Sequence, residues 1–357
     1  MKVTAWIVRN PREPMVLEER EESPGAGEVI VRTAGCGVCH TDLGFYYEGV
    51  PTRAGFPLAL GHEVSGTVVE AGEGAESWME QDVVVPAVIP CGKCAACRSG
   101  HGSICAKQIF PGNDVHGGFA THLRVPAEGL CPVPDLSDPE KNPGGLELRA
   151  LSVIADAVST PYQAIRRSGL EEGDLAIFVG AGGVGGFGVQ VAASRGARVI
   201  AIDPQEERLA LMESHGASLC LRPDRLEFRE LRAKVREFAK GSGTPSWRWK
   251  IFECSGTGAG QASAFGLLAP GSYLSIVGYT PKKTEIRLSN LMAFDATAQG
   301  NWGCIPELYP AVLDLVLSGK VSLEPFVEFR PLATINETFA ELHNRKISRR
   351  VILSPEE

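Results

Sequence analysis

The 357-residue sequence predicts an α/β protein in which a domain with a parallel sheet is inserted between two parts of a mostly-β domain. Three observations predict this fold class. Residues 25–125 read as short strands broken by glycine, strands and helical runs alternate after residue 158, and a mixed pattern returns after residue 300. The length, at roughly 150 residues per domain, also favours two domains.

The individual elements follow from the spacing of apolar residues and glycines. Short β-branched runs bounded by glycine predict strands, and buried apolar runs followed by helical runs predict βα units. A glycine after each helical run is a suitable C-cap. The expected elements are strands 28–35, 64–72 and 175–180, helix 183–196, strand 198–203, helix 206–216, strands 250–256 and 273–280, and a closing strand 349–354.

Charge and hydrophobicity exclude several classes of protein. The formal net charge is −8, so we expect no nucleic-acid partner and no attraction to an anionic membrane. No apolar run reaches the roughly 18 residues of a membrane span, and the N-terminal apolar stretch stops at Arg9, too early for a signal peptide. The ten cysteines are clustered, which favours metal binding over disulfides and a reducing cytoplasm.

Residues 180–185 read GAGGVG and fit the pattern G-x-G-x-x-G between an expected strand and an expected helix. In this context the first glycine permits a tight turn, the second lets the backbone approach a pyrophosphate, and the third lets the helix pack on the strand. The helix N-terminus adds free N–H groups and the positive end of its dipole. We therefore expect a bound dinucleotide at Gly180, Gly182, Gly183, Val184 and Gly185.

Asp203 ends the next expected strand, 18 residues after Gly185. A carboxylate at this position would accept hydrogen bonds from the adenosine ribose and repel a 2′-phosphate, which favours NAD over NADP. The alternative is that Asp203 only caps the following helix.

Four cysteines form a compact cluster in a short polar lobe at about residues 90–106. Cys91, Cys94, Cys97 and Cys105 have the spacing C-x2-C-x2-C-x7-C. Four thiolates complete a tetrahedral shell with no open position, so we expect a structural Zn²⁺ on which the folding of the lobe depends. A disulfide pair or an iron–sulfur cluster is the alternative.

A second set of metal-ligating side chains is dispersed along the chain, in GVCHTD at 37–42 and GHE at 61–63. Cys39 and His62 could bind one Zn²⁺ while a third protein ligand completes an open, catalytic site. An isolated Cys or His is more often a core residue, but the combination with a dinucleotide loop favours a metal.

These motifs resemble the zinc-dependent medium-chain alcohol dehydrogenases over essentially the whole chain. The matching strings are GVCHTD, GHEVSG, the cysteine lobe, the glycine loop and the terminal RRVIL. The resemblance implies a GroES-like catalytic domain at 1–157, a doubly wound Rossmann domain that binds NAD at 158–299, and a return to the catalytic domain at 300–357. It also implies two Zn²⁺ per subunit and a homo-oligomer, which is commonly a tetramer in bacterial relatives.

The resemblance assigns ligands to the catalytic zinc. The third ligand falls at Asp156, where relatives often have Cys, so we expect a site made of Cys39, His62 and Asp156. Oxygen ligation should leave the zinc slightly more electrophilic than a second thiolate would. The alternative is that Asp156 caps a helix and Glu63 is the third ligand. Asp42 would bind the far nitrogen of His62.

Further roles carry over by resemblance. Thr41 would bind the substrate oxygen and start a proton relay through the nicotinamide ribose. The His that often ends this relay is replaced by Gly44, so the relay must end in water or at His40. His40 and Arg350 would contact the cofactor pyrophosphate, and Arg208 the adenosine ribose.

Longer strings at 155–164, 249–256 and 288–304 resemble the 6-hydroxycyclohex-1-ene-1-carbonyl-CoA dehydrogenases of anaerobic benzoyl-CoA degradation. This resemblance implies oxidation of a cyclic, allylic secondary alcohol, carried as a CoA thioester, to the 6-oxo product with NAD⁺. Candidate cationic contacts for CoA are Arg53, Lys282, Lys283 and Arg287. The alternatives are a generic secondary-alcohol or polyol dehydrogenase and, in another class, a zinc- and NAD-binding regulatory protein without turnover.

Overall fold

The computed structural model describes residues 1–355 and divides the chain into two compact units. Unit 1 comprises Met1–Ser159, Gly303–Gly319 and the chain from Leu323 onward. Unit 2 comprises Thr160–Trp302 and Lys320–Ser322. The chain therefore leaves unit 1, builds unit 2 and returns, which is the change of pattern seen in the sequence.

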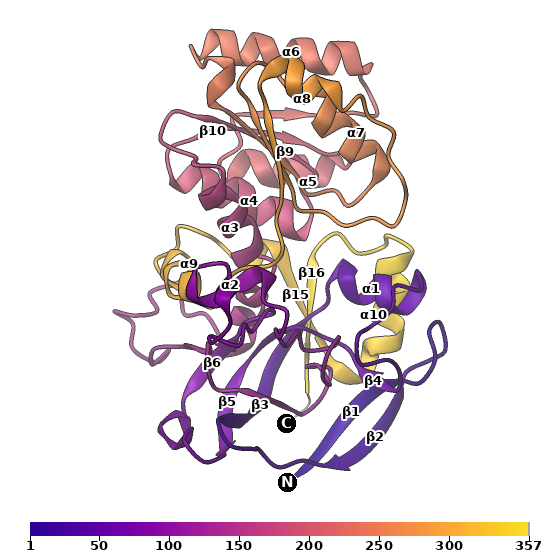
Figure 1. Ribbon diagram of the computed structural model, residues 1–357, viewed down its shortest axis with the longest axis vertical. Helices are drawn as coiled ribbons and strands as arrows, with labels where there is room; N and C mark the ends of the chain where they lie inside the picture. Colours follow the sequence, from indigo (N-terminus) through magenta and orange to yellow (C-terminus); the bar gives the residue numbers. More distant parts are fainter. Residues whose placement is uncertain (356–357) are drawn as a thin grey trace. The chain divides into compact units, whose positions relative to one another are not determined.

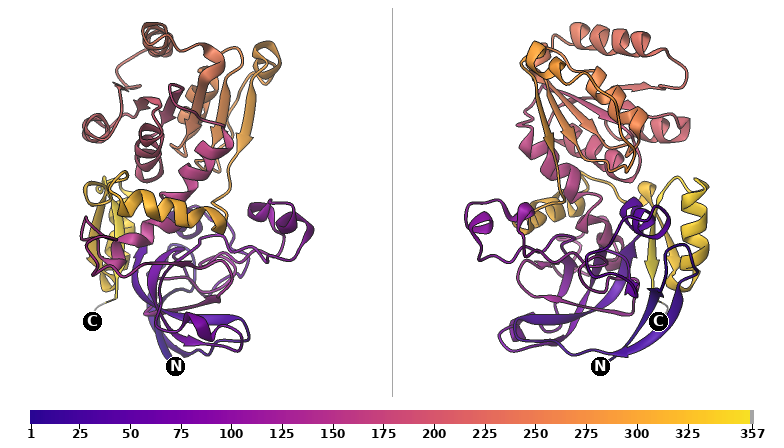
Figure 2. Two further views of the ribbon diagram at one scale, coloured as in Figure 1. Left: turned by 90° about the vertical axis from the view of Figure 1, so that its left-hand side faces the viewer. Right: turned by 45° about the vertical axis from the view of Figure 1, so that its right-hand side comes forward.

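Unit 2 contains a parallel sheet with the strand order β11-β10-β9-β12-β13-β14. The order reverses between β9 and β12, and in such sheets ligands bind outside the carboxyl ends of the strands at this point. Figure 1 labels β9, β10 and the helices α3 to α8, and Figure 2 shows helices on both sides of the strands. The elements are α3 (Ser159–Arg167), β9 (Leu175–Val179), α4 (Gly183–Ser194), β10 (Arg198–Ile202), α5 (Glu206–Ser214), β11 (Leu219–Leu221), α6 (Phe228–Gly241), β12 (Trp249–Glu253), α7 (Gly258–Gly266), β13 (Tyr273–Ile276), α8 (Ser289–Phe294) and β14 (Thr297–Gly300).

Strand β9 is apolar throughout because both faces of the sheet are covered. Ile177 packs in one cluster with Leu231 of α6 and Phe265 of α7. On the other face, Phe178 stacks on Phe252 with ring centroids 4.7 Å apart, and a Cβ on Gly188 of α4 would lie only 2.4 Å from its ring. Burial on both faces is what a continuous apolar run in a parallel sheet predicts.

Two expected strands end several residues earlier in the structure, and the first of them, β12, ends at Glu253 rather than at residue 256. Strand β13 ends at Ile276 rather than at residue 280. The N–H groups of Val277 and Gly278 both donate to the carbonyl of Glu253, at 2.9 Å each, so the chain turns here and the ladder does not continue. The turn brings this segment over the end of β12.

Unit 1 is built mainly from antiparallel strands. Its larger sheet has the order β15-β16-β3-β5-β6-β8, with β7 also paired to β3, and a smaller sheet has the order β2-β1-β4. The strands are β1 (Lys2–Val8), β2 (Val16–Glu21), β3 (Glu28–Gly37), β4 (Leu58–Ala59), β5 (Glu63–Ala71), β6 (Asp82–Val85), β7 (His122–Pro126), β8 (Cys131–Pro132), β15 (Val327–Pro331) and β16 (Arg350–Ser354). The α-helices are α1 (His40–Tyr47), α2 (Ala95–Arg98), α9 (Tyr309–Leu317) and α10 (Ile335–His343), and the longest 3-10 helix is η3 (Leu148–Ala155).

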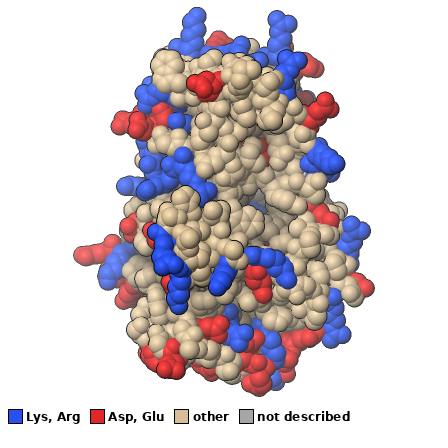
Figure 3. Space-filling model, in the orientation of Figure 1, with Lys and Arg blue, Asp and Glu red and all other residues tan. Residues whose placement is uncertain are grey.

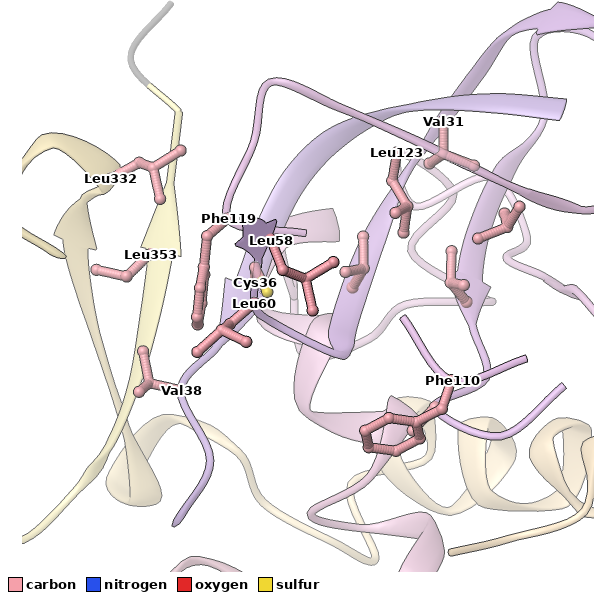
Figure 4. Packing of buried hydrophobic residues seen from close by; sticks show 14 of the residues in the cluster. Val31, Cys36, Val38, Leu58, Leu60, Phe110, Phe119, Leu123, Leu332 and Leu353 are labelled. Atoms are coloured by element: carbon pink, nitrogen blue, oxygen red, sulfur yellow. The ribbon is translucent and has the colours of Figure 1, made fainter. Parts of the chain in front are cut away.

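The core of unit 1 surrounds the end of β3. Figure 4 shows Cys36 among Leu58, Leu60 and Phe119, and Cys36 is fully buried. Its sulfur therefore fills a small space in the core, which fits a packing role better than a redox pair with Cys39.

Charged side chains of both signs lie on the face of the molecule that Figure 3 shows. Figure 3 shows Lys and Arg interspersed with Asp and Glu on the face that it displays. Within residues 1–355, no helix is both long and apolar enough to cross a membrane.

Candidate active site

Cys39 is placed by the start of α1. Strand β3 ends at Gly37, and Cys39 is the N-cap of α1 with Asp42 at the third helical position. The N–H of Cys39 donates to Oδ2 of Asp42 at 2.9 Å, one half of a capping box. The helix start therefore fixes Cys39 and Asp42 relative to each other.

His62 is placed by the same carboxylate from the other side. Gly61 has φ +96°, and a Cβ on it would lie 2.8 Å from the sulfur of Cys36 and 2.9 Å from the ring of Phe119, so only glycine fits. The N–H of Gly61 donates to Oδ1 of Asp42 at 3.1 Å, and the same oxygen lies 3.3 Å from Nδ1 of His62. Asp42, fully buried, thus contacts the far nitrogen of the histidine.

Asp156 brings the third donor atom. It ends η3, and its Oδ2 lies 3.5 Å from Sγ of Cys39 and 3.5 Å from Nε2 of His62. Ligands at zinc bond lengths of about 2.0–2.3 Å on a tetrahedron are about 3.3–3.8 Å apart. The three atoms therefore fit one zinc ion, with the fourth vertex supplied by none of them.

Charge in this site also suits a cation. Burial opposes protonation of His62, but the Asp42 charge and the contacts with Asp156 outweigh it and raise the pKa of His62 well above its usual value. The cluster therefore attracts positive charge, which a bound metal ion would supply in place of the proton.

Glu63 lies in the same cluster but is already engaged. Its Oε2 accepts a hydrogen bond from Nε of Arg350 at 2.9 Å, and its Oε1 pairs with the other arm of that guanidinium. Oε1 also accepts the N–H of Ala157 at 3.0 Å. Both partners of the ion pair are buried. This arrangement favours Asp156 over Glu63 as the third metal ligand, because a metal would have to displace Arg350.

Arg350 was expected at the cofactor pyrophosphate. In the structure its guanidinium binds Glu63 and lies 3.9 Å from Oδ2 of Asp156. The sequence motif RRVIL gave no sign of this pair, because its two members are 287 residues apart. The pyrophosphate contact stays a prediction.

The residues expected to take part in a proton relay lie at the start of α1. The hydroxyl of Thr41 is 3.7 Å from the sulfur of Cys39, and Thr41 is half-buried. His40, the first residue of the helix, is exposed. Gly44 is buried and has no side chain to offer a proton.

In the cysteine lobe, the distances between the four sulfur atoms are close to those of four thiolates that bind one metal ion. Sγ of Cys94 lies 3.4 Å from that of Cys97 and 3.8 Å from that of Cys105, which is 3.5 Å from Cys91. The N–H groups of Cys91 and Lys107 donate to Sγ of Cys105 at 3.4 and 3.3 Å. Tetrahedral Zn–S bonds of about 2.3 Å place sulfurs about 3.8 Å apart, so the lobe fits a structural zinc.

Thiol pKa values in the lobe point the same way. The backbone N–H of Lys93 and the neighbouring thiols lower the pKa of Cys91 to about 6, whereas partial burial and those thiols raise the pKa of Cys97 to about 12. The thiols of Cys91 and Cys97 therefore differ in how readily they ionise, and a cation between them would favour the thiolate form of both.

The glycine loop has the shape that a dinucleotide requires. Gly180 has φ +96°, and a Cβ on Gly185 would lie 1.8 Å from the carbonyl oxygen of Gly180. Helix α4 starts after its N-cap Gly182, and Gly182, Gly183 and Val184 remain partly exposed. The free N–H groups of the helix N-terminus are thus accessible to a phosphate.

Asp203 lies beside this loop. Its Oδ2 accepts the N–H of Ala181 at 2.8 Å and its Oδ1 accepts that of Gln205 at 2.9 Å. A carboxylate has about four acceptor positions, so two remain for ribose hydroxyls. Nη1 of Arg208 lies 3.7 Å from Oδ2, on the side of Gly182.

One residue near the group formed by Cys39, His62 and Asp156 was not predicted from the sequence. Tyr309 is buried, and its hydroxyl donates to the carbonyl of Ala155, next to Asp156. No spacing rule links positions 154 residues apart, so only a three-dimensional structure identifies this contact.

The candidate CoA contacts are of two kinds. Arg53 forms an ion pair with Asp114 at 2.6 Å. Lys282, Lys283 and Arg287 are exposed in the segment between β13 and α8.

Comparison with protein families accounts for both units. Residues 25–135 match the alcohol dehydrogenase GroES-like domain, and residues 183–318 match the zinc-binding dehydrogenase family. The expected fold class, a GroES-like domain together with a Rossmann-type domain, is thereby confirmed.

Individual relatives span nearly the whole chain. An L-threonine 3-dehydrogenase of Pyrococcus abyssi is 32% identical over 87% of this chain and 86% of its own. An alcohol dehydrogenase of Geobacillus stearothermophilus is 29% identical over 99% of both chains. The crystal structure of the alcohol dehydrogenase from Aeropyrum pernix, 28% identical, superimposes with a TM-score of 0.85 and covers 99% of this chain and 100% of that one. The chain therefore belongs to the zinc-dependent medium-chain alcohol dehydrogenases, oxidoreductases that act on CH–OH groups.

Proposed function

We propose that unit 1 is the catalytic domain and unit 2 the NAD-binding domain of an enzyme that oxidises a secondary alcohol to a ketone with NAD⁺. The observation that carries this proposal is the convergence of Cys39, His62 and Asp156 at distances that fit one zinc ion. A zinc held by Cys39, His62 and Asp156 would supply Lewis acidity for the alcohol oxygen, and an NAD⁺ held at the glycine loop would supply the hydride acceptor. The oxidation of the alcohol to the ketone also releases one proton from the hydroxyl.

The chain's own residues position the groups and move the proton. Asp42 holds the ring of His62 through Nδ1 and so orients Nε2 towards Asp156 and Cys39. The hydroxyl of Thr41 lies beside the sulfur of Cys39 and accepts the alcohol proton. With glycine at position 44, the proton continues to water or to His40 at the exposed start of α1.

Cofactor choice is assigned to unit 2. We propose that the N–H groups at Gly182, Gly183 and Val184 bind the pyrophosphate, and that Asp203 accepts the adenosine ribose hydroxyls and repels a 2′-phosphate. Arg208 then lines the same ribose. Asp203 is expected to make the enzyme prefer NAD⁺ to NADP⁺.

For the substrate, we propose 6-hydroxycyclohex-1-ene-1-carbonyl-CoA, oxidised to the 6-oxo thioester. The support is the likeness of the strings at 155–164, 249–256 and 288–304, together with exposed cations in segment 282–287 that suit CoA phosphates. The product is a conjugated enone, which favours oxidation. The relatives' names favour a second candidate, a generic secondary-alcohol or polyol dehydrogenase.

One experiment separates these candidates. NADH formation is measured with the zinc-loaded enzyme on cyclic hydroxyacyl-CoA thioesters, simple secondary alcohols, polyols and L-threonine. The proposal predicts the highest kcat/KM for the thioester. An equal or higher kcat/KM for a simple alcohol or polyol would show that the proposed substrate is wrong. No turnover on any alcohol despite bound zinc and NAD would favour a regulatory protein.

The assembly is proposed from resemblance alone, and the location from the clustered cysteines. We propose a cytoplasmic homotetramer, for which light scattering of the purified protein is the direct test.

A further inference from the structure

The segment that carries Asp156 has an unusually well anchored carbonyl. The oxygen of Ala155 accepts a hydrogen bond from the hydroxyl of Tyr309, one from the hydroxyl of Ser159 at 3.1 Å, and one from the N–H of Ala87 at 3.4 Å. A peptide oxygen has two lone pairs, so three donors on one oxygen fix its direction strongly. The orientation of the peptide group between Ala155 and Asp156 is therefore fixed.

The peptide on the other side of Asp156 is held as well. The N–H of Ala157 donates to Oε1 of Glu63 at 3.0 Å, and Arg350 fixes the carboxylate of Glu63. Asp156 thus lies between two anchored peptides. Its side chain, however, is the more exposed part of the segment, at 16%.

Tyr309 contributes a hydroxyl that packing alone would not require. It is fully buried at the start of α9, where phenylalanine would fill nearly the same space. Its hydroxyl donates to the carbonyl of Ala155, and its oxygen accepts the N–H of Ala87 at 3.2 Å, an N–H that it shares with that carbonyl. Burial raises the pKa of Tyr309 well above its usual value, which keeps the hydroxyl protonated as a donor.

We propose that Tyr309 is a positioning residue for the catalytic metal: through the Ala155 carbonyl, its hydroxyl sets the direction from which Asp156 presents its carboxylate to the zinc. An aspartate has one more side-chain torsion than the cysteine that relatives often have there, so its ligand atom depends more on a fixed backbone. This inference rests on the proposed function, in which Asp156 is a metal ligand.

The test compares Tyr309→Phe with a matched control, Tyr46→Phe. Tyr46 is also a buried tyrosine of unit 1, at 5% exposure, whose hydroxyl donates to a backbone carbonyl, that of Glu13 at 2.6 Å. Two quantities are measured. One is the affinity for the second Zn²⁺, the one at Cys39, His62 and Asp156, in a chelator competition, and the other is the visible spectrum of the enzyme with Co²⁺ at that site. We expect Tyr309→Phe to weaken that affinity about 10- to 100-fold and to shift the Co²⁺ bands, and Tyr46→Phe to match the wild type.

A second variant with a smaller expected effect keeps the test valid if Tyr309→Phe does not fold. Ser159→Ala removes another donor to the same carbonyl and should shift the Co²⁺ bands in the same direction by a smaller amount. Retention of the lobe zinc and an unchanged melting temperature would show that each variant is folded. Wild-type affinity and spectrum in Tyr309→Phe, or an equal loss in Tyr46→Phe, would overturn the inference.

A further variant separates this inference from the proposed function. If Asp156→Ala keeps the second metal and an unchanged Co²⁺ spectrum, the ligand assignment itself is wrong. If Asp156→Ala loses the second metal while Tyr309→Phe keeps it with an unchanged spectrum, only the positioning role of Tyr309 fails.

Discussion

The cysteine lobe takes its ligands from positions 91–105, whereas Asp156 lies 117 residues from Cys39. The lobe uses four like sulfurs, three of them partly exposed, and its supporting contacts are backbone N–H groups. The dispersed site uses sulfur, nitrogen and oxygen, and a surrounding layer of Asp42, Glu63 and Arg350 holds it. A local site with uniform ligands stabilises a fold, and a dispersed site with a supporting layer leaves one position open for chemistry.

The largest effect on activity should come from a substitution in the dispersed site, which consists of Cys39, His62 and Asp156. His62→Ala removes one ligand, so we expect the second zinc to be lost and kcat/KM to fall about 1000-fold, since the metal's charge stabilisation is worth several kcal/mol. Metal analysis should show one zinc per chain instead of two. The lobe zinc serves as the internal control, and a variant that keeps both zincs and its activity would remove the distinction between the sites.

Cys97→Ser removes a ligand from the cysteine lobe and leaves the dispersed site intact. It should also leave one zinc per chain, but the lobe should open locally, because its folding is coupled to the metal. We expect proteolysis within residues 90–106 to accelerate about tenfold or more, while kcat stays within about twofold. Limited proteolysis followed by mass spectrometry gives the cleavage sites. Complete loss of activity at low temperature would show that the lobe also serves the reaction.

Ligand type is the next point of comparison. Asp156→Cys turns the dispersed site into a site with two sulfurs and one nitrogen. Both zincs should remain, kcat should fall by less than about tenfold because a thiolate leaves the zinc less electrophilic, and the Co²⁺ derivative should gain sulfur charge-transfer absorption. Asp156→Asn is the control of similar size. An unchanged Co²⁺ spectrum would mean that residue 156 does not touch the metal.

These comparisons also show what the sequence could predict. The lobe and the glycine loop were predictable because each is a local pattern whose spacing matches one geometry. Asp156 was predicted from a family resemblance, since an aspartate after an apolar run carries no signal of its own. The Glu63–Arg350 pair and Tyr309 were not predictable as partners, because their contacts depend on how β5, β16 and α9 pack, and packing has no spacing rule.

The smallest effect concerns a buried carboxyl without a cation. Glu63 has Arg350, but no ion pair joins Glu253 of β12 to a Lys or Arg among residues 1–355, and burial raises the pKa of Glu253. The folded state then binds this proton more tightly than the unfolded chain, so stability should fall as pH rises from about 4.5 towards neutral. Glu253→Gln should make the melting temperature less dependent on pH over that range. A melting curve as pH-dependent as that of the wild type would contradict this.

The most direct measurement is a crystal structure of the zinc-loaded protein with anomalous data at the zinc edge. Two peaks per chain are predicted, one among the four lobe sulfurs and one bound by Cys39, His62 and Asp156 with a vacant or solvent-filled fourth position. A single peak in the lobe, or a second peak bound by Glu63 with Asp156 turned away, would contradict the proposed active site.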